Sequence, residues 1–276
     1  MHKFPSNIKF YFQLARAFLR KIKLFLLKTA YRIHNFIRYG SVKIFSGVEI
    51  ETNSKCNRRC AYCPNSLFNR GEKLIKEGVY YKIIQELKDL HYMGQISPHF
   101  YGEPLLDKRL PQLLSYTKKY LPYSHIRIYT NGDFLTKQLF TTLVRAGVHD
   151  FLITGHGGNM PEHIKKLMST DLGKQMIHFN TIDQNKTPLF NRGGLVKPKK
   201  QIVMKNCILA SEHLVIDCQG NIILCCNDYL SSIKFGNVNE EKIIDVWRRK
   251  EFRKIRNETK RGKYMLDICR QCNKPL

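Results

Sequence analysis

The sequence predicts an α/β protein whose core is a partial (β/α)6, TIM-like barrel with a small C-terminal hairpin-plus-helix domain. Two observations support this prediction. Between residues 46 and 196, short apolar runs alternate with stretches of helical periodicity, an order that gives a parallel sheet. Polar and glycine-rich clusters follow the apolar runs directly, at the strand ends where α/β proteins place their functional sites. With about six such units, the barrel is expected to stay open.

Residues 1–45 are predicted to form a basic amphipathic helix. No Asp or Glu precedes Glu49, and apolar residues recur at steps of three and four, as in Ala15, Phe18 and Ile22. Lysines and arginines interrupt them too often for a membrane-spanning segment, which needs about 20 predominantly apolar residues. Two interpretations remain open: the helix lies on an anionic membrane surface, or it packs across the barrel with its lysines in solvent.

The composition indicates acidic partners or surroundings. The 276 residues carry a formal net charge of +25, which suits an anionic membrane face, nucleic acid, or a phosphorylated or acidic substrate. Nine cysteines, an odd number that includes an adjacent pair, argue against a secreted disulfide framework. A cytoplasmic protein is expected, positioned at the inner membrane face if the N-terminal helix binds lipid.

The elements of the barrel follow one another in regular order. The periodicity predicts helices over residues 77–90, 108–120 and 136–146, and strands over residues 48–52, 126–129 and 150–154, with a further strand-like run ending at residues 100–104. A linker is expected at residues 197–200, and residues 197–276 are assigned to the C-terminal domain, with a hairpin at 214–224 and a helix over 243–255.

Three cysteines, Cys56, Cys60 and Cys63, follow the first strand with the spacing Cys-x3-Cys-x2-Cys. A loop this short brings three thiolates together, as soft-metal or iron–sulfur ligation requires. Three protein ligands also leave one position open, which distinguishes a reactive metal centre from a closed structural one. A zinc knuckle that takes its fourth ligand from elsewhere is the alternative.

With Tyr62 before the last cysteine, this loop resembles the cluster loop of the radical S-adenosylmethionine (radical SAM) enzymes. The resemblance implies that the three cysteines bind a [4Fe–4S] cluster whose free iron takes the amino and carboxylate groups of S-adenosylmethionine. One electron, from a donor such as a flavodoxin or ferredoxin, then cleaves the cofactor to methionine and a 5′-deoxyadenosyl radical. Tyr62 is assigned to the cofactor site on the same basis.

Two further clusters resemble elements of that family. Tyr101-Gly102-Glu103-Pro104 is similar to its Gly-Gly-Glu-Pro element, which implies that Gly102 and Glu103 hold the amino group of the cofactor; tyrosine replaces the first glycine. Thr130 and Asn131 stand where the family places polar residues against the ribose. Taken alone, each cluster would be a plain turn after a strand.

Two other residues on the same rim are weaker candidates. Arg192, in an Asn-Arg-Gly-Gly segment, could clamp the cofactor's carboxylate through a bidentate pair. His156 could act as an acid or base near neutral pH, although a single loop histidine is more often exposed and without a role.

The C-terminal domain carries four more cysteines at ligand spacings: Cys207, Cys225, Cys269 and Cys272. A hairpin and one helix make too small a core for independent stability, so a metal site is expected, either a closed [4Fe–4S] cluster or zinc.

Around these cysteines, the segments 220–228 and 236–238 resemble the SPASM extension of radical SAM enzymes in its abbreviated "twitch" form. The resemblance implies one auxiliary [4Fe–4S] cluster with all irons bound by protein.

Cys218 and Cys226 are left over. Cys218 is expected to be a buried apolar thiol. Cys226 adjoins a proposed ligand, and neighbouring strand residues point to opposite faces, so its thiol is expected to face away from the auxiliary cluster. It could pack as structural filler, or it could return a hydrogen atom to a substrate radical, as in an epimerisation.

The leading hypothesis is therefore a radical SAM enzyme of the oxidoreductase or maturase type. It would take hydrogen from a peptide or a sugar-type substrate, including a phosphorylated or activated sugar, with the auxiliary cluster aiding oxidation or substrate placement. The alternative is a zinc-stabilised basic module that binds nucleic acid without catalysis, through cations such as Arg248, Arg249 and Arg253.

Overall fold

The structure is a computed structural model that describes residues 44–156 and 158–275, together with isolated positions between residues 18 and 37. Those isolated positions, which include Phe18, Phe25 and Phe36, are helical. The rest of the predicted N-terminal helix lies outside the described residues.

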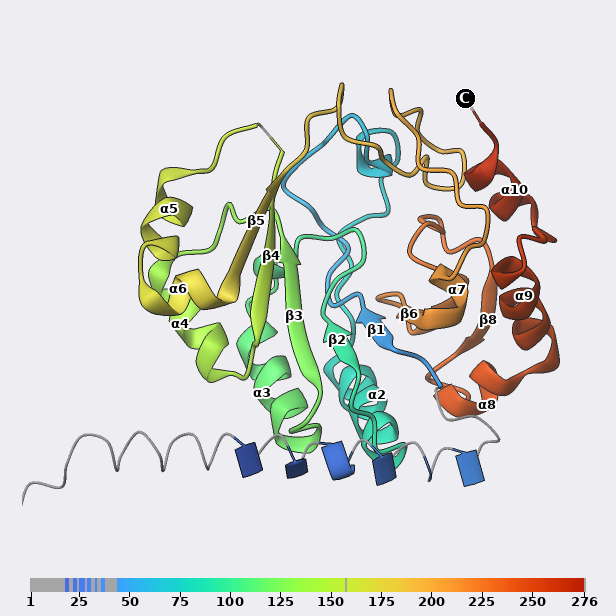
Figure 1. The fold of residues 1–276 in the computed structure, drawn as a ribbon, viewed down its shortest axis with the longest axis horizontal. Helices are drawn as coiled ribbons and strands as arrows, with labels where there is room; N and C mark the ends of the chain where they lie inside the picture. The colour runs from blue at the N-terminus through green and yellow to red at the C-terminus, as the bar shows by residue number, and fades with distance from the viewer. Residues whose placement is uncertain are drawn as a thin grey trace, which may run out of the picture.

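One open sheet of eight strands organises the described part of the chain, in the order β5-β4-β3-β2-β1-β6-β7-β8. The pairs from β5 to β6 in this order are parallel, and β7 and β8 add on antiparallel. In Figure 1 the blue strand β1 accordingly lies between the green β2 and the orange β6. The strands are β1 (Gly47–Ile50), β2 (Gln95–Ser97), β3 (His125–Thr130), β4 (Asp150–Gly155), β5 (Ile177–Thr181), β6 (His213–Ile216), β7 (Asn221–Ile223) and β8 (Lys234–Asn237). The predicted partial barrel is confirmed in this open form.

The helices of the barrel connect its parallel strands, as predicted. They are α2 (Glu77–Asp89), α3 (Leu110–Tyr120), α4 (Lys137–Arg145), α5 (Glu162–Met168) and α6 (Asp171–Met176), with single 3-10 turns η1 (Pro64–Ser66) and η2 (Pro104–Leu106). The C-terminal part contains α7 (Leu209–Glu212), α8 (Ile243–Arg248), α9 (Lys250–Lys260) and α10 (Asp267–Asn273). None of the described helices is long and apolar enough to cross a membrane.

The prediction of a single helix over residues 243–255 is wrong, because the helix is interrupted at Arg249. This residue has the extended backbone angle ψ 134°, which separates α8 from α9. Its guanidinium binds the Phe235 carbonyl and the Glu241 carboxylate, which hold it in place. The break lets Trp247 and Phe252 pack edge to face, with ring centroids 5.2 Å apart. Tertiary packing therefore outweighs the local helical pattern.

The two faces of the sheet differ in polarity. Alternate strand residues such as Ile50, Ile96 and Ile128 are fully buried in apolar clusters that include residues of α2, α3 and α4. Side chains alternate along a strand, so the intervening residues point to the opposite, inner face. That face carries Glu49, Glu51, Gln95, Ser97, Arg127 and Tyr129. Parallel strands are usually apolar on both faces, so this polar inner face indicates a functional surface.

The segment between β5 and α7 positions further residues of the site. Residues 182–208, gold to orange in Figure 1, pass the upper side of the view, where the blue loop after β1 also lies. Since β6 pairs in parallel with β1, the C-terminal part continues the sheet of the barrel. The domain boundary near residue 196 stays a prediction.

Candidate active site and metal centres

The loop after β1 presents Cys56, Cys60 and Cys63 as free, half-buried thiols. Asn53 shapes its start: the Asn53 side chain accepts from the Lys55 amide (2.7 Å) and donates to the Glu103 carbonyl (2.8 Å). A turn bond from the Cys63 amide to the Cys60 carbonyl (2.8 Å) closes its end before η1. The loop is thus an ordered structure joined to the segment that follows β2.

Burial raises the pKa of all three thiols in this loop. Thiolates so placed need a local positive charge, and bound iron supplies it while deprotonating its ligands. Three soft donors on one ordered loop therefore fit an iron–sulfur cluster that keeps one iron open. Among the described residues, no three His, Cys, Asp or Glu side chains are spaced to hold a single metal ion.

Glu103 connects the segment after β2 to the end of β3. Its carboxylate is 3% exposed and accepts hydrogen bonds from the Thr130 hydroxyl (2.6 Å), the Asn131 amide (2.9 Å) and the Leu105 amide (3.1 Å). Burial raises the pKa of Glu103, while these hydrogen bonds act in the opposite direction. The predicted residues Glu103, Thr130 and Asn131 therefore form one unit.

Gly102 allows the close contact on which this unit depends. A Cβ at this position would lie 1.8 Å from the Asn53 carbonyl oxygen, so only glycine fits. The tyrosine that precedes it is accommodated differently: Tyr101 points away and donates to the Cys226 carbonyl (2.9 Å).

A polar network that the sequence did not reveal connects the cysteine loop to the turn after β3. Arg58 pairs with Asp133 through two hydrogen bonds of 2.7 and 2.5 Å, and the Asn57 amide also donates to Asp133 (2.7 Å). Asn131 donates to Asn57 in turn (2.8 Å). The hydrogen bonds from Arg58 are the main reason that the pKa of Asp133 is lowered. The only signal in the sequence was that these polar residues lie within or beside the motifs.

Tyr62 and His156 meet across the top of the site. The Tyr62 hydroxyl contacts His156 Nδ1, and the two ring centroids are 5.9 Å apart. Burial lowers the pKa of His156, so the imidazole is neutral at pH 7. His156 is therefore half-buried and in contact with Tyr62, not exposed as expected, because the tertiary structure brings the loop after β4 onto the cysteine loop.

Arg192 is a half-buried cation close to both cysteine sets. It adopts a left-handed backbone (φ 54°), and its guanidinium donates to Asn227 Oδ1 (2.9 Å) and lies 5.6 Å from the centre of the Tyr101 ring. Its charge is within electrostatic range of Cys63 in the barrel and of Cys272 in the C-terminal part. No ion pair of Arg192 with a described carboxylate is found, so most of its five donor hydrogens can bind a ligand.

The four C-terminal cysteines come from three elements. Cys269 and Cys272 lie one turn apart on α10, Cys207 precedes α7, and Cys225 follows β7. Burial, together with the nearby Cys207 and Cys272, raises the pKa of Cys269 to about 12. Cys225 lies within electrostatic range of Cys269 and Cys272. The fold thus brings together four thiols, the donor set of a cluster ligated by protein alone.

The two leftover cysteines occupy different surroundings. Cys218 is buried (7% exposed), and its pKa is raised to about 12, chiefly by burial. Cys226 packs on Phe100, Val215 and Ile223, whereas Cys225 belongs to the outer apolar cluster. Cys226 therefore faces the inner side of the sheet, opposite to its neighbour.

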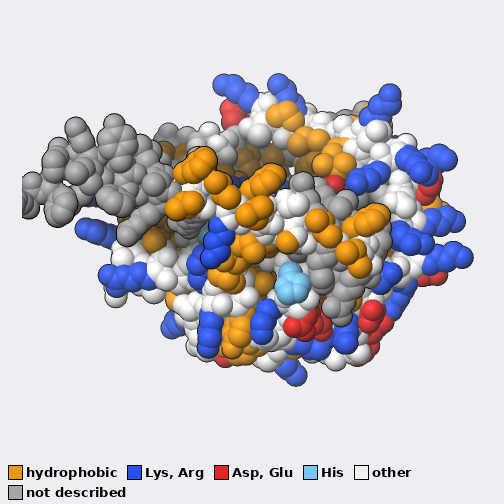
Figure 2. All heavy atoms as spheres, turned by 60° about the horizontal axis from the view of Figure 1, so that its bottom comes forward, with side chains coloured by type: hydrophobic (Ala, Val, Ile, Leu, Met, Phe, Trp, Pro, Cys, Tyr) orange, Lys and Arg blue, Asp and Glu red, His pale blue; other side chains and the backbone are white. Residues whose placement is uncertain are grey.

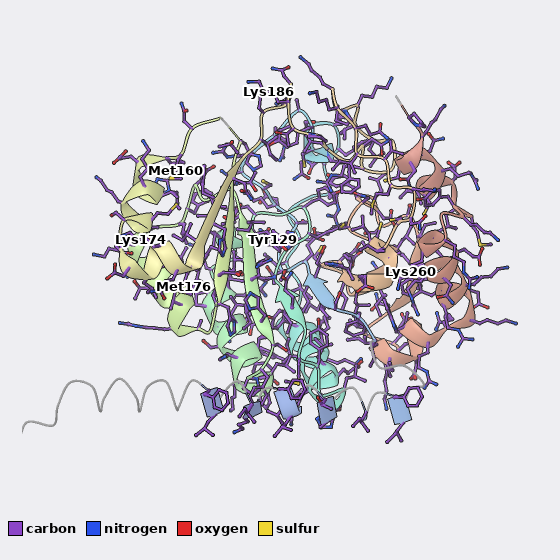
Figure 3. All side chains as sticks on the ribbon, in the orientation of Figure 1. Tyr129, Met160, Lys174, Met176, Lys186 and Lys260 are labelled. Carbon is purple, nitrogen blue, oxygen red and sulfur yellow. The ribbon has the colours of Figure 1, made fainter. Side chains whose placement is uncertain are left out.

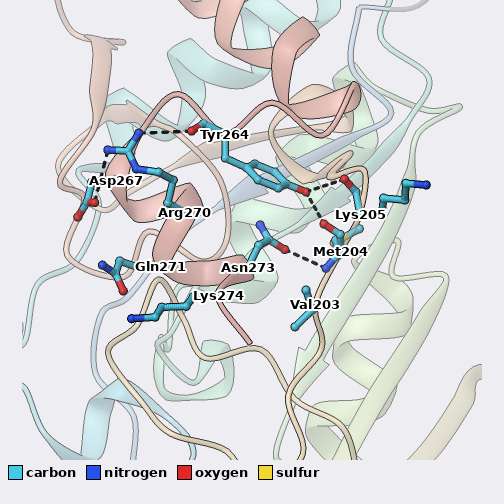
Figure 4. Close-up of a pocket in the computed structure, with 9 residues that line it drawn as sticks. All are labelled: Val203, Met204, Lys205, Tyr264, Asp267, Arg270, Gln271, Asn273 and Lys274. Atoms are coloured by element: carbon cyan, nitrogen blue, oxygen red, sulfur yellow. Dashed lines mark hydrogen bonds and ion pairs between the residues drawn. The ribbon is translucent and has the colours of Figure 1, made fainter. Parts of the chain in front are cut away.

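Figure 4 shows a pocket of about 530 Å³ beside α10 that is separate from this site. Its lining includes Met204, Tyr264, Arg270 and Asn273, and Tyr264 donates to backbone carbonyls of residues 204 and 205. It contains none of the predicted site residues.

Two family models match the chain. The model described as the radical SAM superfamily matches residues 50–179, and the model described as SPASM, an iron–sulfur cluster-binding domain, matches residues 207–273.

Individual proteins and structures are also similar to it. The S-adenosyl-L-methionine-dependent 2-deoxy-scyllo-inosamine dehydrogenase of Niallia circulans is 37% identical over 240 residues, which cover 84% of this chain and 94% of that protein. The crystal structure of BtrN in complex with AdoMet and 2-DOIA has a TM-score of 0.76 at 33% identity and covers 83% of this chain and 93% of that one. Streptococcus suis SuiB bound to its precursor peptide SuiA has a TM-score of 0.53 at 14% identity, covers 82% of this chain and 70% of that one, and shares the fold alone.

Proposed function

Because this chain belongs to the radical SAM superfamily and carries a SPASM iron–sulfur domain, we propose that it is a dehydrogenase that oxidises a hydroxyl group of an aminocyclitol or a similar amino sugar. Membership confirms the predicted enzyme class and its cofactors, a SAM-binding [4Fe–4S] cluster, auxiliary cluster chemistry and S-adenosylmethionine. The noncatalytic zinc module loses its support.

The observation that carries the substrate proposal is the similarity to one dehydrogenase along nearly its whole length. At 37% identity, the match spans 94% of a protein named for oxidation of 2-deoxy-scyllo-inosamine. The peptide-bound structure shares only 14% identity, so its similarity indicates a common fold and gives no information about the substrate of this chain. A sugar-type substrate is therefore favoured over a peptide.

The proposed roles follow from the geometry of the site. Cys56, Cys60 and Cys63 would hold the SAM-binding cluster, and Cys207, Cys225, Cys269 and Cys272 the auxiliary cluster. When bound, the first cluster and its cofactor supply the radical that takes a hydrogen atom from the substrate. The binding site of the cofactor is shaped by Gly102, Glu103, Thr130 and Asn131. Its edge is formed by Tyr62, which contacts His156.

Arg192 is the cation best placed to bind an anionic group in this site. It is half-buried, it donates one hydrogen bond to Asn227, and it lies within electrostatic range of both cysteine sets. The carboxylate of S-adenosylmethionine is the proposed partner, because a planar guanidinium matches a carboxylate through two parallel hydrogen bonds.

A direct experiment tests the proposed reaction. Anaerobically cluster-loaded protein, supplied with reductant, S-adenosylmethionine and 2-deoxy-scyllo-inosamine, should release 5′-deoxyadenosine and a ketone two hydrogens lighter than the substrate. Formation of 5′-deoxyadenosine without the ketone would contradict the substrate proposal but not the family.

An epimerase is the second candidate, and Cys226 is the observation that favours it. Its thiol lies on the inner side of the sheet, and its raised pKa of about 12, due first to burial, keeps it protonated and able to donate a hydrogen atom. In H2O, an epimerase would return an isomer with the mass of the substrate. In D2O, that isomer would carry one deuterium.

Contacts with an electron donor and with a membrane complete the proposal. A flavodoxin or ferredoxin in the cytoplasm would supply electrons to this basic protein.

Several described N-terminal side chains are apolar and exposed: Phe18, Leu19, Ile22, Phe25, Leu26, Ile33, Phe36 and Ile37. The face in Figure 2 shows apolar side chains interspersed with lysines and arginines, a pattern that suits an anionic bilayer surface. Flotation with anionic liposomes should be stronger for the intact chain than for one lacking residues 1–43; equal flotation would refute membrane contact.

A further inference from the structure

The inner face of the sheet contains a half-buried histidine, His99, that no part of the proposed cofactor site uses. His99 lies two residues beyond β2, so its side chain shares the inner face with Gln95 and Ser97. Its ring stacks on that of Tyr129 of β3, with centroids 4.5 Å apart and planes 23° from parallel. Figure 3 places Tyr129 near the centre of the molecule.

The two ring nitrogens of His99 differ in their surroundings. Nδ1 is buried and has no hydrogen-bond partner. Nε2 also makes no hydrogen bond with a described residue, but it does not belong to the described buried side-chain atoms that lack a partner. Leaving a buried N–H unsatisfied costs more than leaving a lone pair unsatisfied, so the proton belongs on the reachable nitrogen, Nε2. Burial also lowers the pKa of His99 and keeps the ring neutral. His99 therefore presents a single N–H donor.

The charged groups around this donor come from several elements. Four charged or titratable groups lie within electrostatic range of His99: Glu49 of β1, Glu51 just after β1, His213 of β6, and Arg192. Glu49 is already in contact with His213, Oε1 to Nδ1, at 3.2 Å. Glu51 is held by Arg70 through two bonds of 2.6 and 2.8 Å. Both carboxylates thus have partners, which leaves the His99 donor for a ligand.

An oxygen acceptor with adjacent amine character suits this environment. A hydroxyl oxygen can accept from Nε2–H, and the carboxylate of Glu49 provides negative charge nearby for an ammonium group. A polyhydroxylated ring with an amine has both features. Resting on the proposed function, we propose that His99 Nε2–H donates a hydrogen bond to a hydroxyl oxygen of the aminocyclitol substrate and thereby determines specificity.

Three substitutions separate a contact from a structural role. Gln places its amide nitrogen near the Nε2 position, Asn reaches only the Nδ1 position, and Phe keeps the stacking on Tyr129 without any donor. Cluster-loaded full-length variants would be compared by equilibrium dialysis of 2-deoxy-scyllo-inosamine and by steady-state kinetics. For His99→Asn and His99→Phe, Kd and KM should rise about tenfold, whereas His99→Gln should stay within about threefold of the wild type.

The controls test folding and the chemistry of the cofactor separately. His178→Gln changes an exposed histidine on β5 and should leave Kd unchanged. Iron content and the rate of 5′-deoxyadenosine formation without substrate should be the same in all variants. If the wild type binds and oxidises the aminocyclitol and His99→Phe binds it equally well, the contact is refuted alone. If the wild type neither binds nor oxidises it, the proposed function and this contact fail together.

Discussion

At the scale of single residues, the site depends on side chains that hold other side chains in place. Glu103 is an example, since the resemblance assigned it to the cofactor and the structure shows three hydrogen bonds to protein groups. The carboxylate therefore shapes the turn that carries Thr130 and Asn131. A role in contacting the cofactor would come in addition to this positioning role.

Glu103→Gln should destabilise the protein by about 1–3 kcal/mol, because an amide cannot accept from both the Thr130 hydroxyl and the Asn131 amide. Urea unfolding under anaerobic conditions measures this effect, and affinity for S-adenosylmethionine should fall with it. Glu72→Gln, which removes an exposed ion pair with Lys55, is the matched control and should cost at most about 0.5 kcal/mol. Equal stability of the two variants would contradict the role of Glu103.

Cys226→Ala distinguishes the two candidate reactions. A dehydrogenase passes the electron of the substrate radical onward and needs no hydrogen donor, so the variant should keep turnover within about threefold of the wild type. An epimerase would lose product while still consuming S-adenosylmethionine. Product mass and deuterium content, measured by mass spectrometry, decide between these outcomes.

At the scale of elements, strand and helix positions were predictable because each has its own periodicity of apolar residues. The helices over 77–90 and 108–120 appear within two residues of the predicted bounds. The break at Arg249 was not predictable, since nothing in the local pattern signals the contacts with Phe235 and Glu241. The contact of Tyr62 with His156 was not predictable for the same reason. The motif residues were predictable, because each motif is a local pattern in the sequence.

Asp150 joins β3 and β4 and gives a pH-dependent test of this pairing. Its carboxylate accepts two hydrogen bonds from Arg127 (2.7 and 2.8 Å) and one from His125 (3.0 Å). Burial alone would raise the pKa of Asp150, but these bonds outweigh it and hold the pKa below its usual value. The native pKa is lowered, so the stabilisation is complete above the unfolded pKa of about 3.9 and is lost as the pH falls through the native value.

Asp150→Asn should therefore lower the free energy of unfolding by about 1–3 kcal/mol at pH 7 and at pH 5. The difference from the wild type should shrink only below about pH 4. Urea unfolding at pH 7, 5 and 3 measures it, with Asp183→Asn at an ion pair with Lys186 as the control. A difference that grew as the pH fell would contradict the assignment.

At the scale of the whole molecule, one sheet carries both cysteine sets. Since β1 precedes the first set and β6 pairs with β1 on the way to Cys225, the same strands position both sites. Arg192 lies within electrostatic range of a cysteine from each set. This arrangement would let an electron leave the substrate region toward the auxiliary site, as an oxidation requires.

Replacing Cys269 and Cys272 together by Ala tests that arrangement. Two [4Fe–4S] clusters bring about eight irons per chain, and loss of two of the four ligands should leave about four. The variant should still cleave S-adenosylmethionine, since Cys56, Cys60 and Cys63 are untouched, but ketone formation should stop because the substrate radical has no acceptor. Iron analysis, 5′-deoxyadenosine yield and ketone yield are measured together. Cys218→Ala, which removes a buried thiol outside both sets, should keep all irons and both yields. A double variant that retains about eight irons would refute the auxiliary site, and one that loses iron but still forms ketone would show that the auxiliary cluster is not the electron acceptor.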